Sequence, residues 1–213
     1  MDLIFQKFSF LFKIKQDVLQ KWIQIINQKY NEKQRFYHNQ NHIENILLIF
    51  NSFLLENDKF NEKSKQIIEL SAIFHDLIYD PQSKENELNS VKLFKEFSKE
   101  INLENQMIEK IERIILATQE NHAIFSTESD LELKIFLDLD YSILGSNKEE
   151  YQEYKNAIRK EYSHFNDKEF KEGRLKFIKN VLKNKIFLTD YFEDKFEEKA
   201  KKNLEEEKKE LNL

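Results

Sequence analysis

The chain has 213 residues, a formal net charge of −5, no cysteine, two glycines and one proline. This length fits a single domain with a continuous apolar core, and the lack of cysteine excludes disulfide frameworks, thiolate metal sites and cysteine nucleophiles. The negative charge disfavours broad binding to nucleic acid or to anionic membranes. With so little glycine and proline and with 34% charged residues, the composition favours long helices.

Apolar residues recur at helical spacing along most of the chain, and no segment shows convincing strand alternation. The predicted helices cover residues 5–30, 42–55, 62–79, 86–97, 103–119, 131–144, 149–162, 167–182 and 191–211. We therefore predict an all-α fold of about eight or nine helices. We expect one domain, 1–213, with an N-terminal helix within 1–30 and a charged C-terminal helix within 191–213.

The first residues, MDLIFQKFSFLFKIKQ, form an apolar stretch that is interrupted by Lys7, Lys13 and Lys15. This stretch lacks a small-residue cleavage site, so it is a poor match to a signal peptide. No segment has the apolar length that is needed to cross a bilayer. We therefore expect a cytoplasmic location and no membrane partner.

The third predicted helix is mostly apolar after Ile67 and leads to a His75-Asp76 pair. Pro81 disfavours helical geometry at Asp80, so the pair should lie near a helix C-terminus that faces a loop. A protein buries His and Asp only with partners. One interpretation is a capping pair, in which Asp76 binds a backbone amide and His75 favours the helix C-terminus. The other is a divalent metal site with nitrogen and oxygen ligands.

Two further features favour the metal interpretation. His42 opens the second predicted helix, upstream of the His-Asp pair. Asp138 and Asp140 lie downstream in another apolar helix, where two buried carboxylates repel each other unless a cation or hydrogen-bond donors neutralise them.

The order His42, His75-Asp76, Asp140 resembles the HD superfamily, whose signature is a His, a His-Asp pair on a later helix and a distant Asp. More narrowly, the chain resembles a small bacterial family of predicted metal-dependent HD phosphohydrolases. The segments that carry this resemblance are RFYHNQNHI, AIFHDLIYDP with a following NELNS, FLDLDYSILG, YQEYKNAIRKEY and GR. They occur in the family's order between residues 22 and 204.

The resemblance implies a helical HD-domain fold with metal ligation by His42, His75, Asp76 and Asp140. In related enzymes the distal ligand is usually the second residue of an Asp-x-Asp pair, which favours Asp140. Asp138 is the alternative ligand, and otherwise a residue that orients one. We expect a divalent ion, with Mn as the first choice and Fe, Zn, Co or Mg as alternatives.

Two acidic residues are candidates for handling protons. Alarmone hydrolases of the superfamily carry a Glu-Asp pair where this chain has Tyr79-Asp80, so Asp80 could activate water, but their activity does not carry over directly. Glu87, in the NELNS segment, is the other candidate, and its alternative role is a favourable charge in the first turn of a helix. His122 could bind a second metal ion or be a surface histidine at a helix end.

Residues that could bind a phosphorylated substrate follow from the same segments. Arg forms planar, bidentate pairs with phosphate, and Arg35, Arg159 and Arg174 lie in the motifs. Tyr37 could stack on a base or belong to the core. His38 could bind phosphate or be a loop histidine that bonds to the backbone.

We therefore expect a metal-dependent phosphohydrolase that acts on a nucleotide-like phosphate ester or pyrophosphate. The first alternative is a catalytically inactive HD-domain sensor that binds a nucleotide without turnover. A second alternative is a helical interaction module whose charged C-terminal helix is the contact surface. The expected partner is a small phosphorylated molecule, and the sequence leaves homo-oligomer formation open.

Overall fold

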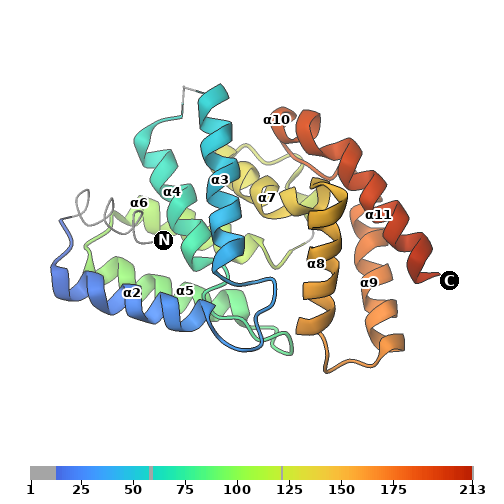
Figure 1. Cartoon of the computed structure of the whole chain (residues 1–213). Helices are drawn as coiled ribbons and strands as arrows, with labels where there is room; N and C mark the ends of the chain where they lie inside the picture. Colours follow the sequence, from blue (N-terminus) through green and yellow to red (C-terminus); the bar gives the residue numbers. More distant parts are fainter. Residues whose placement is uncertain (1–12, 58–59, 121, 213) are drawn as a thin grey trace. The chain divides into compact units, whose positions relative to one another are not determined.

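The computed structural model describes residues 13–57, 60–120 and 122–212 (Figure 1). Across these residues the structure is helical and has no strand, which confirms the predicted all-α class. The described part holds nine α-helices of 11 residues or more, in agreement with the predicted number. The chain forms two compact units, Met1–Gln119 and Glu120–Leu213, and the expected single domain 1–213 stays a prediction.

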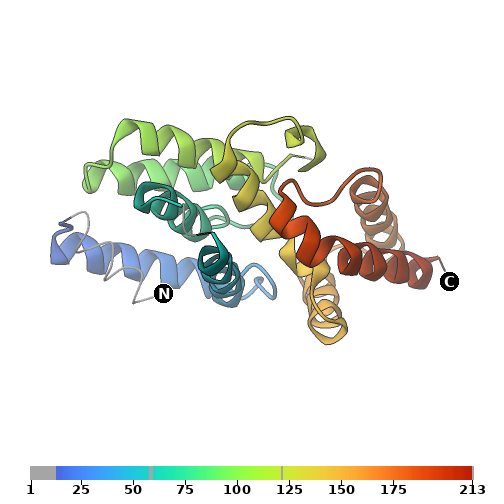
Figure 2. The ribbon, with the colours of Figure 1, turned by 90° about the horizontal axis from the view of Figure 1, so that it is seen from above.

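The first unit is built around one buried helix. Its helices are α2 (Gln16–Tyr30), α3 (Gln40–Glu56), α4 (Glu62–Phe74), α5 (Asn86–Glu100) and α6 (Asn105–Ala117). Helix α4 contacts α3, α5 and α6, and α5 lies beside α6 (Figure 2). Every residue of α4 from Ile67 to Phe74 is buried, so the end of this helix lies within the core of the unit.

Aromatic rings fill the core beside α4. The ring of Phe74 lies 6.1 Å from that of Trp22 on α2 and 5.0 Å from that of Phe97 on α5. Trp22 and Phe97 are 5.4 Å apart in an edge-to-face arrangement, which aromatic pairs favour. These contacts join α2, α4 and α5 immediately before the His75-Asp76 pair.

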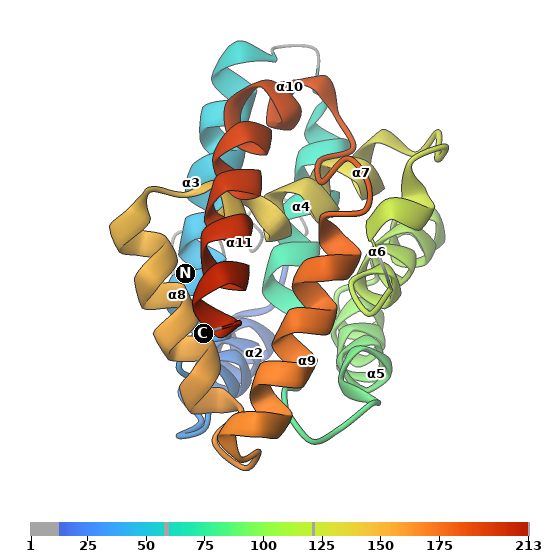
Figure 3. The ribbon, with the colours of Figure 1, turned by 90° about the vertical axis from the view of Figure 1, so that its right-hand side faces the viewer.

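The second unit contains four longer helices and several short turns. Its elements are η1 (His122–Phe125), α7 (Leu131–Tyr141), η2 (Ser142–Gly145), α8 (Lys148–Glu161), α9 (Asp167–Val181), α10 (Asp190–Phe192), the π-helical turn η3 (Glu193–Glu197) and α11 (Glu198–Leu211). Figure 3 shows α11 between α8 and α9. Side chains of α8 and α9 both bond to α11, through Tyr151 and Arg174 to Glu207.

Side-chain caps fix where several helices begin. The side chains of Asn39, Asn61 and Asp130 accept hydrogen bonds from backbone N–H groups at the starts of α3, α4 and α7. Asn147 and Asn166 form full capping boxes at the starts of α8 and α9. Such caps satisfy N–H groups that have no partner within the helix, so the sequence sets these boundaries locally.

Several predicted helices differ from the structure, and three of these differences bear on the fold. The helix predicted at 5–30 is seen from Gln16, after Lys13 with a φ of 50°, and its residues 5–12 lie outside the described residues. The helix predicted at 62–79 ends at Phe74, where side chains bind the carbonyl groups of Ile73 and Leu77. The helix predicted at 191–211 includes the π-helical turn at its start.

In the part of the chain that the structure describes, no helix combines the length and the apolar character that crossing a bilayer requires.

Candidate metal centre

His42, His75 and Asp76 form a compact cluster in the first unit that could hold a metal ion. The Nε2 atoms of His42 and His75 lie 3.2 Å apart, and Asp76 Oδ2 lies 3.1 Å from His75 Nε2 and 3.9 Å from His42 Nε2. Ligand atoms about 2.0–2.2 Å from one ion are about 2.8–3.6 Å apart at octahedral or tetrahedral angles. Two of the three separations lie in this range and the third slightly exceeds it, so the three side chains could hold one divalent ion.

Local structure aims the two imidazoles at each other. His75 follows the last residue of α4, and its Nδ1 donates a hydrogen bond to the Ala72 carbonyl at 3.0 Å. This bond places the proton on Nδ1 and leaves the lone pair on Nε2 for a ligand. His42 lies in the first turn of α3, whose start is capped by Asn39. His75 thus does part of what the capping interpretation predicts and still presents a ligand atom.

The electrostatic surroundings keep Asp76 in its charged form. Burial acts to raise the pKa of the Asp76 carboxyl, but the nearby His75, His38 and His42 side chains together lower this pKa well below its usual range. His42 and His75 are 3% and 1% exposed, so water screens these interactions little. An ionised carboxylate beside two imidazoles is a suitable ligand set for Mn, Fe, Zn or Co.

Arg35 holds the backbone on both sides of the cluster. Its Nη1 donates to the carbonyls of His38 and Asp76 at 3.0 and 2.6 Å, and its Nη2 donates to the Leu77 carbonyl at 2.9 Å. Nε donates to Glu32 at 3.3 Å. The structure thus gives Arg35 an internal role, and its binding of substrate phosphate stays a prediction.

Tyr30 and Tyr79 frame this arginine. The guanidinium carbon lies 4.9 Å from the Tyr30 ring centre and 5.5 Å from the Tyr79 ring centre. The Tyr30 hydroxyl also donates to the carbonyl of Ile73 at 2.9 Å, within the last turn of α4. Side chains from outside α4 therefore bind carbonyls that have no partner within the helix, which explains why it stops at Phe74.

Two of the predicted substrate residues lie against the cluster. The Tyr37 ring is centred 4.8 Å from the His42 ring and 4.9 Å from that of His38. His38 stacks on Tyr79 at 4.2 Å with an angle of 26° between the rings. Both residues are partly exposed, so they form the rim of the candidate metal centre.

The structure separates the two predicted proton-handling acids. Glu87 lies in the first turn of α5, and burial together with the charge of Asp76 raises the pKa of Glu87, although its own backbone N–H acts against this shift. Asp80 is exposed and accepts a hydrogen bond from the Gln82 backbone N–H at 2.9 Å. Glu87 is thus electrostatically linked to the cluster, whereas Asp80 binds the backbone of its own loop. Activation of water by Asp80 stays a prediction.

In the second unit, Asp138 is bound by protein donors. Its Oδ1 accepts from the Leu188 N–H at 2.7 Å, and its Oδ2 accepts from the N–H and hydroxyl of Thr189 at 2.9 and 2.7 Å. These bonds account for a fully buried carboxylate without a cation. Asp140, at the end of α7, is partly buried. Metal ligation by Asp140 stays a prediction.

His122 is buried in the second unit, so its interpretation as a surface histidine is wrong. It is 4% exposed, stacks on Tyr141 at 4.2 Å and donates from Nδ1 to the Ile186 carbonyl at 2.6 Å. Its Nε2 has no hydrogen-bond partner among the described residues and lies 3.8 Å from Asp138 Oδ1. Burial lowers the pKa of His122 to about 4. The second-metal role stays a prediction.

The two remaining predicted arginines bond within the second unit. Arg174 makes a bidentate pair with Glu207 at 2.8 and 3.1 Å and bonds to the Tyr154 hydroxyl at 3.0 Å. Arg159 donates to Asp167 at 2.7 Å and to the carbonyl of Tyr162 at 3.0 Å. Substrate binding by these arginines stays a prediction.

Glu207 is a buried partner of Arg174 that was not predicted, although its position in the sequence carries a signal. Ala200, Asn203 and Leu204 are the other buried residues of α11, and Glu207 follows them at helical spacing. This spacing places Glu207 on the inner face of the helix despite the charged residues around it.

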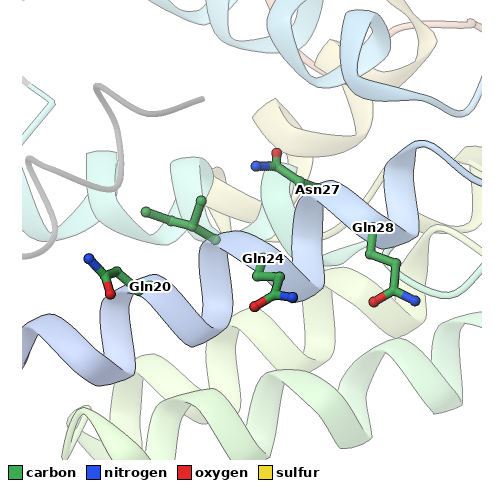
Figure 4. A pocket seen from close by; sticks show the side chains of 5 residues that line it. Gln20, Gln24, Asn27 and Gln28 are labelled. Atoms are coloured by element: carbon green, nitrogen blue, oxygen red, sulfur yellow. The ribbon is translucent and has the colours of Figure 1, made fainter.

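A shallow hollow on the surface of α2 lies apart from the predicted site residues (Figure 4). Its lining residues are Gln20, Ile23, Gln24, Asn27 and Gln28. All five come from one helix, and the polar ones carry neutral amides. This hollow therefore offers no histidine or carboxylate for a metal and no charge for a phosphate.

Comparisons of the chain with protein-family models, with curated proteins and with solved structures find no match in any of the three. The resemblance to HD phosphohydrolases accordingly stays a prediction from the sequence motifs.

Proposed function

We propose that this protein is a metal-dependent phosphohydrolase whose divalent ion is held by His42, His75 and Asp76. The observation that carries the proposal is the 3.2 Å separation of the two imidazole Nε2 atoms, with the Asp76 carboxylate beside them. Two buried imidazoles at this distance fit ligands of one cation. The sequence-based assignment of Asp140 as a further ligand is part of the proposal.

The substrate we propose is a nucleotide-like phosphate ester or pyrophosphate. A divalent ion supplies Lewis acidity at a phosphoryl oxygen and acidifies water. Glu87 accepts or returns the proton, a role that the raised pKa of its carboxyl supports. Tyr37 and His38 contact the phosphate or the leaving group from the rim. Mn is the ion we expect first, with Fe, Zn, Co or Mg as alternatives.

The first test is the metal content of protein purified without chelator, measured by mass spectrometry. We expect about one or more divalent ions per chain, and loss of the ions in folded His75→Ala and Asp76→Asn variants. The matched control is His164→Ala, which removes an exposed histidine and should keep the metal. Wild-type protein that neither carries nor takes up Mn, Fe, Zn, Co or Mg would overturn the metal proposal.

Turnover separates the enzyme from a nucleotide sensor. Phosphate release from a panel of nucleotides with added Mn should occur with wild-type protein and be lost in His75→Ala. Stoichiometric nucleotide binding without phosphate release, in protein that has bound Mn, would favour the sensor instead.

A further inference from the structure

Arg35 connects the two chain segments that carry the ligands of the candidate metal centre. One nitrogen, Nη1, donates to the His38 carbonyl at 3.0 Å and to the Asp76 carbonyl at 2.6 Å. His38 lies in the loop before α3, four residues before His42, and Asp76 is itself a proposed ligand. A single atom therefore joins the segment that leads to one imidazole with the backbone of the carboxylate.

We propose that Arg35 is a positioning residue for the metal centre, which sets the separation of the ligands by holding these carbonyls. The inference rests on the proposed metal function and extends it to a residue that contributes no ligand atom. Arg35 acts through backbone groups, and its side chain is fully buried. This positioning role is distinct from the predicted contact of Arg35 with substrate phosphate.

Among side chains, only a guanidinium can bind these three carbonyl groups at once. Its N–H donors are fixed in one plane, and they bind the carbonyls of His38, Asp76 and Leu77 at the same time. A lysine ammonium at the end of a flexible chain cannot span these three oxygens with one fixed geometry. The rings of Tyr30 and Tyr79 also contact the guanidinium and limit its movement.

The metal centre is sensitive to small displacements. Metal–ligand distances are held to within about 0.2 Å in working sites. If the Arg35 bonds are lost, Asp76 and the segment before His42 can move independently by more than this. The expected result is weaker metal binding and an altered coordination geometry, with the helices retained.

The test is a titration with Co²⁺, followed by visible absorption, for wild type, Arg35→Lys and Arg35→Gln. We expect Co²⁺ affinity to fall by about 10- to 100-fold in both variants, with a changed absorption spectrum and unchanged helix content by circular dichroism. The matched control is Tyr30→Phe, which removes the donor to Ile73 and keeps the ring beside Arg35. Its affinity and spectrum should stay as in wild type.

Each other outcome is decisive. If Arg35→Lys and Arg35→Gln bind Co²⁺ with wild-type affinity and spectrum, the positioning role is overturned while the metal function stands. If Tyr30→Phe shows the same loss, the effect is one of general stability and the inference fails. Variants that stay unfolded even at saturating Co²⁺ would likewise assign Arg35 to folding. Wild-type protein without Co²⁺ binding would overturn the proposed function, and the inference with it.

Discussion

The imidazole Nε2 atoms of His42 and His75 lie 3.2 Å apart, although 33 positions separate the residues in sequence. Chelation should therefore lower the stability of the first unit, because a bound ion stabilises only the folded arrangement. At a free metal concentration of 100 times Kd, the expected gain in unfolding free energy is about 2.7 kcal/mol. Thermal melts with chelator and with Mn measure it.

In His75→Ala the melting temperature should no longer depend on Mn. His164→Ala is the control and should respond as wild type does. An equal response to Mn in wild type and in His75→Ala would show that the ion binds elsewhere.

Asp138 and Asp140 should respond differently to the same chemical change. In Asp138→Asn, an NH₂ group would face donors from Leu188 or Thr189. The expected loss of unfolding free energy is about 2–4 kcal/mol, measured by urea denaturation. Asp140→Asn should keep most of the stability and reduce Mn affinity.

The opposite pattern, in which Asp138→Asn binds Mn more weakly and Asp140→Asn unfolds more easily, would exchange the two roles. Thr189→Val is a useful control for Asp138. It removes one donor to the carboxylate and should cost only about 1 kcal/mol.

His122 should make the second unit less stable in acid. Burial lowers the pKa of His122 from 6.5 to about 4, so below pH 6.5 the unfolded chain takes up a proton that the folded chain does not. The contribution of His122 to the free energy of unfolding is complete above pH 6.5. It is lost as the pH falls toward 4, by at most about 1.4 kcal/mol per pH unit. The His122→Gln variant should lack this loss.

Asp138 changes the stability with pH in the opposite direction, so its effect must be distinguished from that of His122. Burial raises the pKa of Asp138 to about 7, so its contribution to stability decreases as the pH rises from about 4 to 7. The pH dependence of wild-type stability therefore does not isolate the effect of His122. NMR titration of the His122 ring measures its protonation directly, and a midpoint near 6.5 in the folded protein would contradict the prediction.

The two glycines should respond in opposite directions to a methyl group. A Cβ at Gly145 would lie 2.6 Å from the Phe196 carbonyl oxygen and 2.7 Å from its Cβ. Gly145→Ala should therefore lower the unfolding free energy by about 1–3 kcal/mol. Gly173 lies in α9 with nothing within 4 Å of an added Cβ, so Gly173→Ala should stabilise the helix by about 0.5–1 kcal/mol.

Urea denaturation of both variants provides the measurement. Destabilisation by Gly173→Ala of the same size as by Gly145→Ala would mean that the close approach of Phe196 is not the cause.

The buried pair of Arg174 and Glu207 should behave as a unit. Arg174→Met leaves the Glu207 carboxylate buried without its guanidinium, which should cost about 3–5 kcal/mol. The double variant Arg174→Met/Glu207→Leu should recover most of this loss, because it removes both charges. A double variant as unstable as the sum of the single variants would show that the pair is not coupled.

The helices and the residues of the candidate metal cluster were predictable because their signals are local or lie in short motifs. The helix expected at 167–182 is α9 (Asp167–Val181), where Asn166 and Glu169 form the capping box. The motifs selected His42, His75 and Asp76, and the structure brings these three together.

The roles that the sequence could not reveal depend on long-range partners. Arg35 binds backbone carbonyls, which every residue type has. The sequence therefore does not distinguish an arginine that binds a phosphate from one that binds carbonyl groups. The burial of His122 depends on the Ile186 carbonyl, 64 positions away. No periodic pattern connects such positions.

The carbonyl groups around the end of α4 are bound by Tyr30, by Arg35 and by the ring of His75 itself. The terminal turn is therefore fastened to other segments and cannot fray as an ordinary helix end does. Its amide hydrogens should exchange with solvent deuterium only when α2 and the segment before α3 separate from it. We expect these three segments to exchange together, as one cooperative unit.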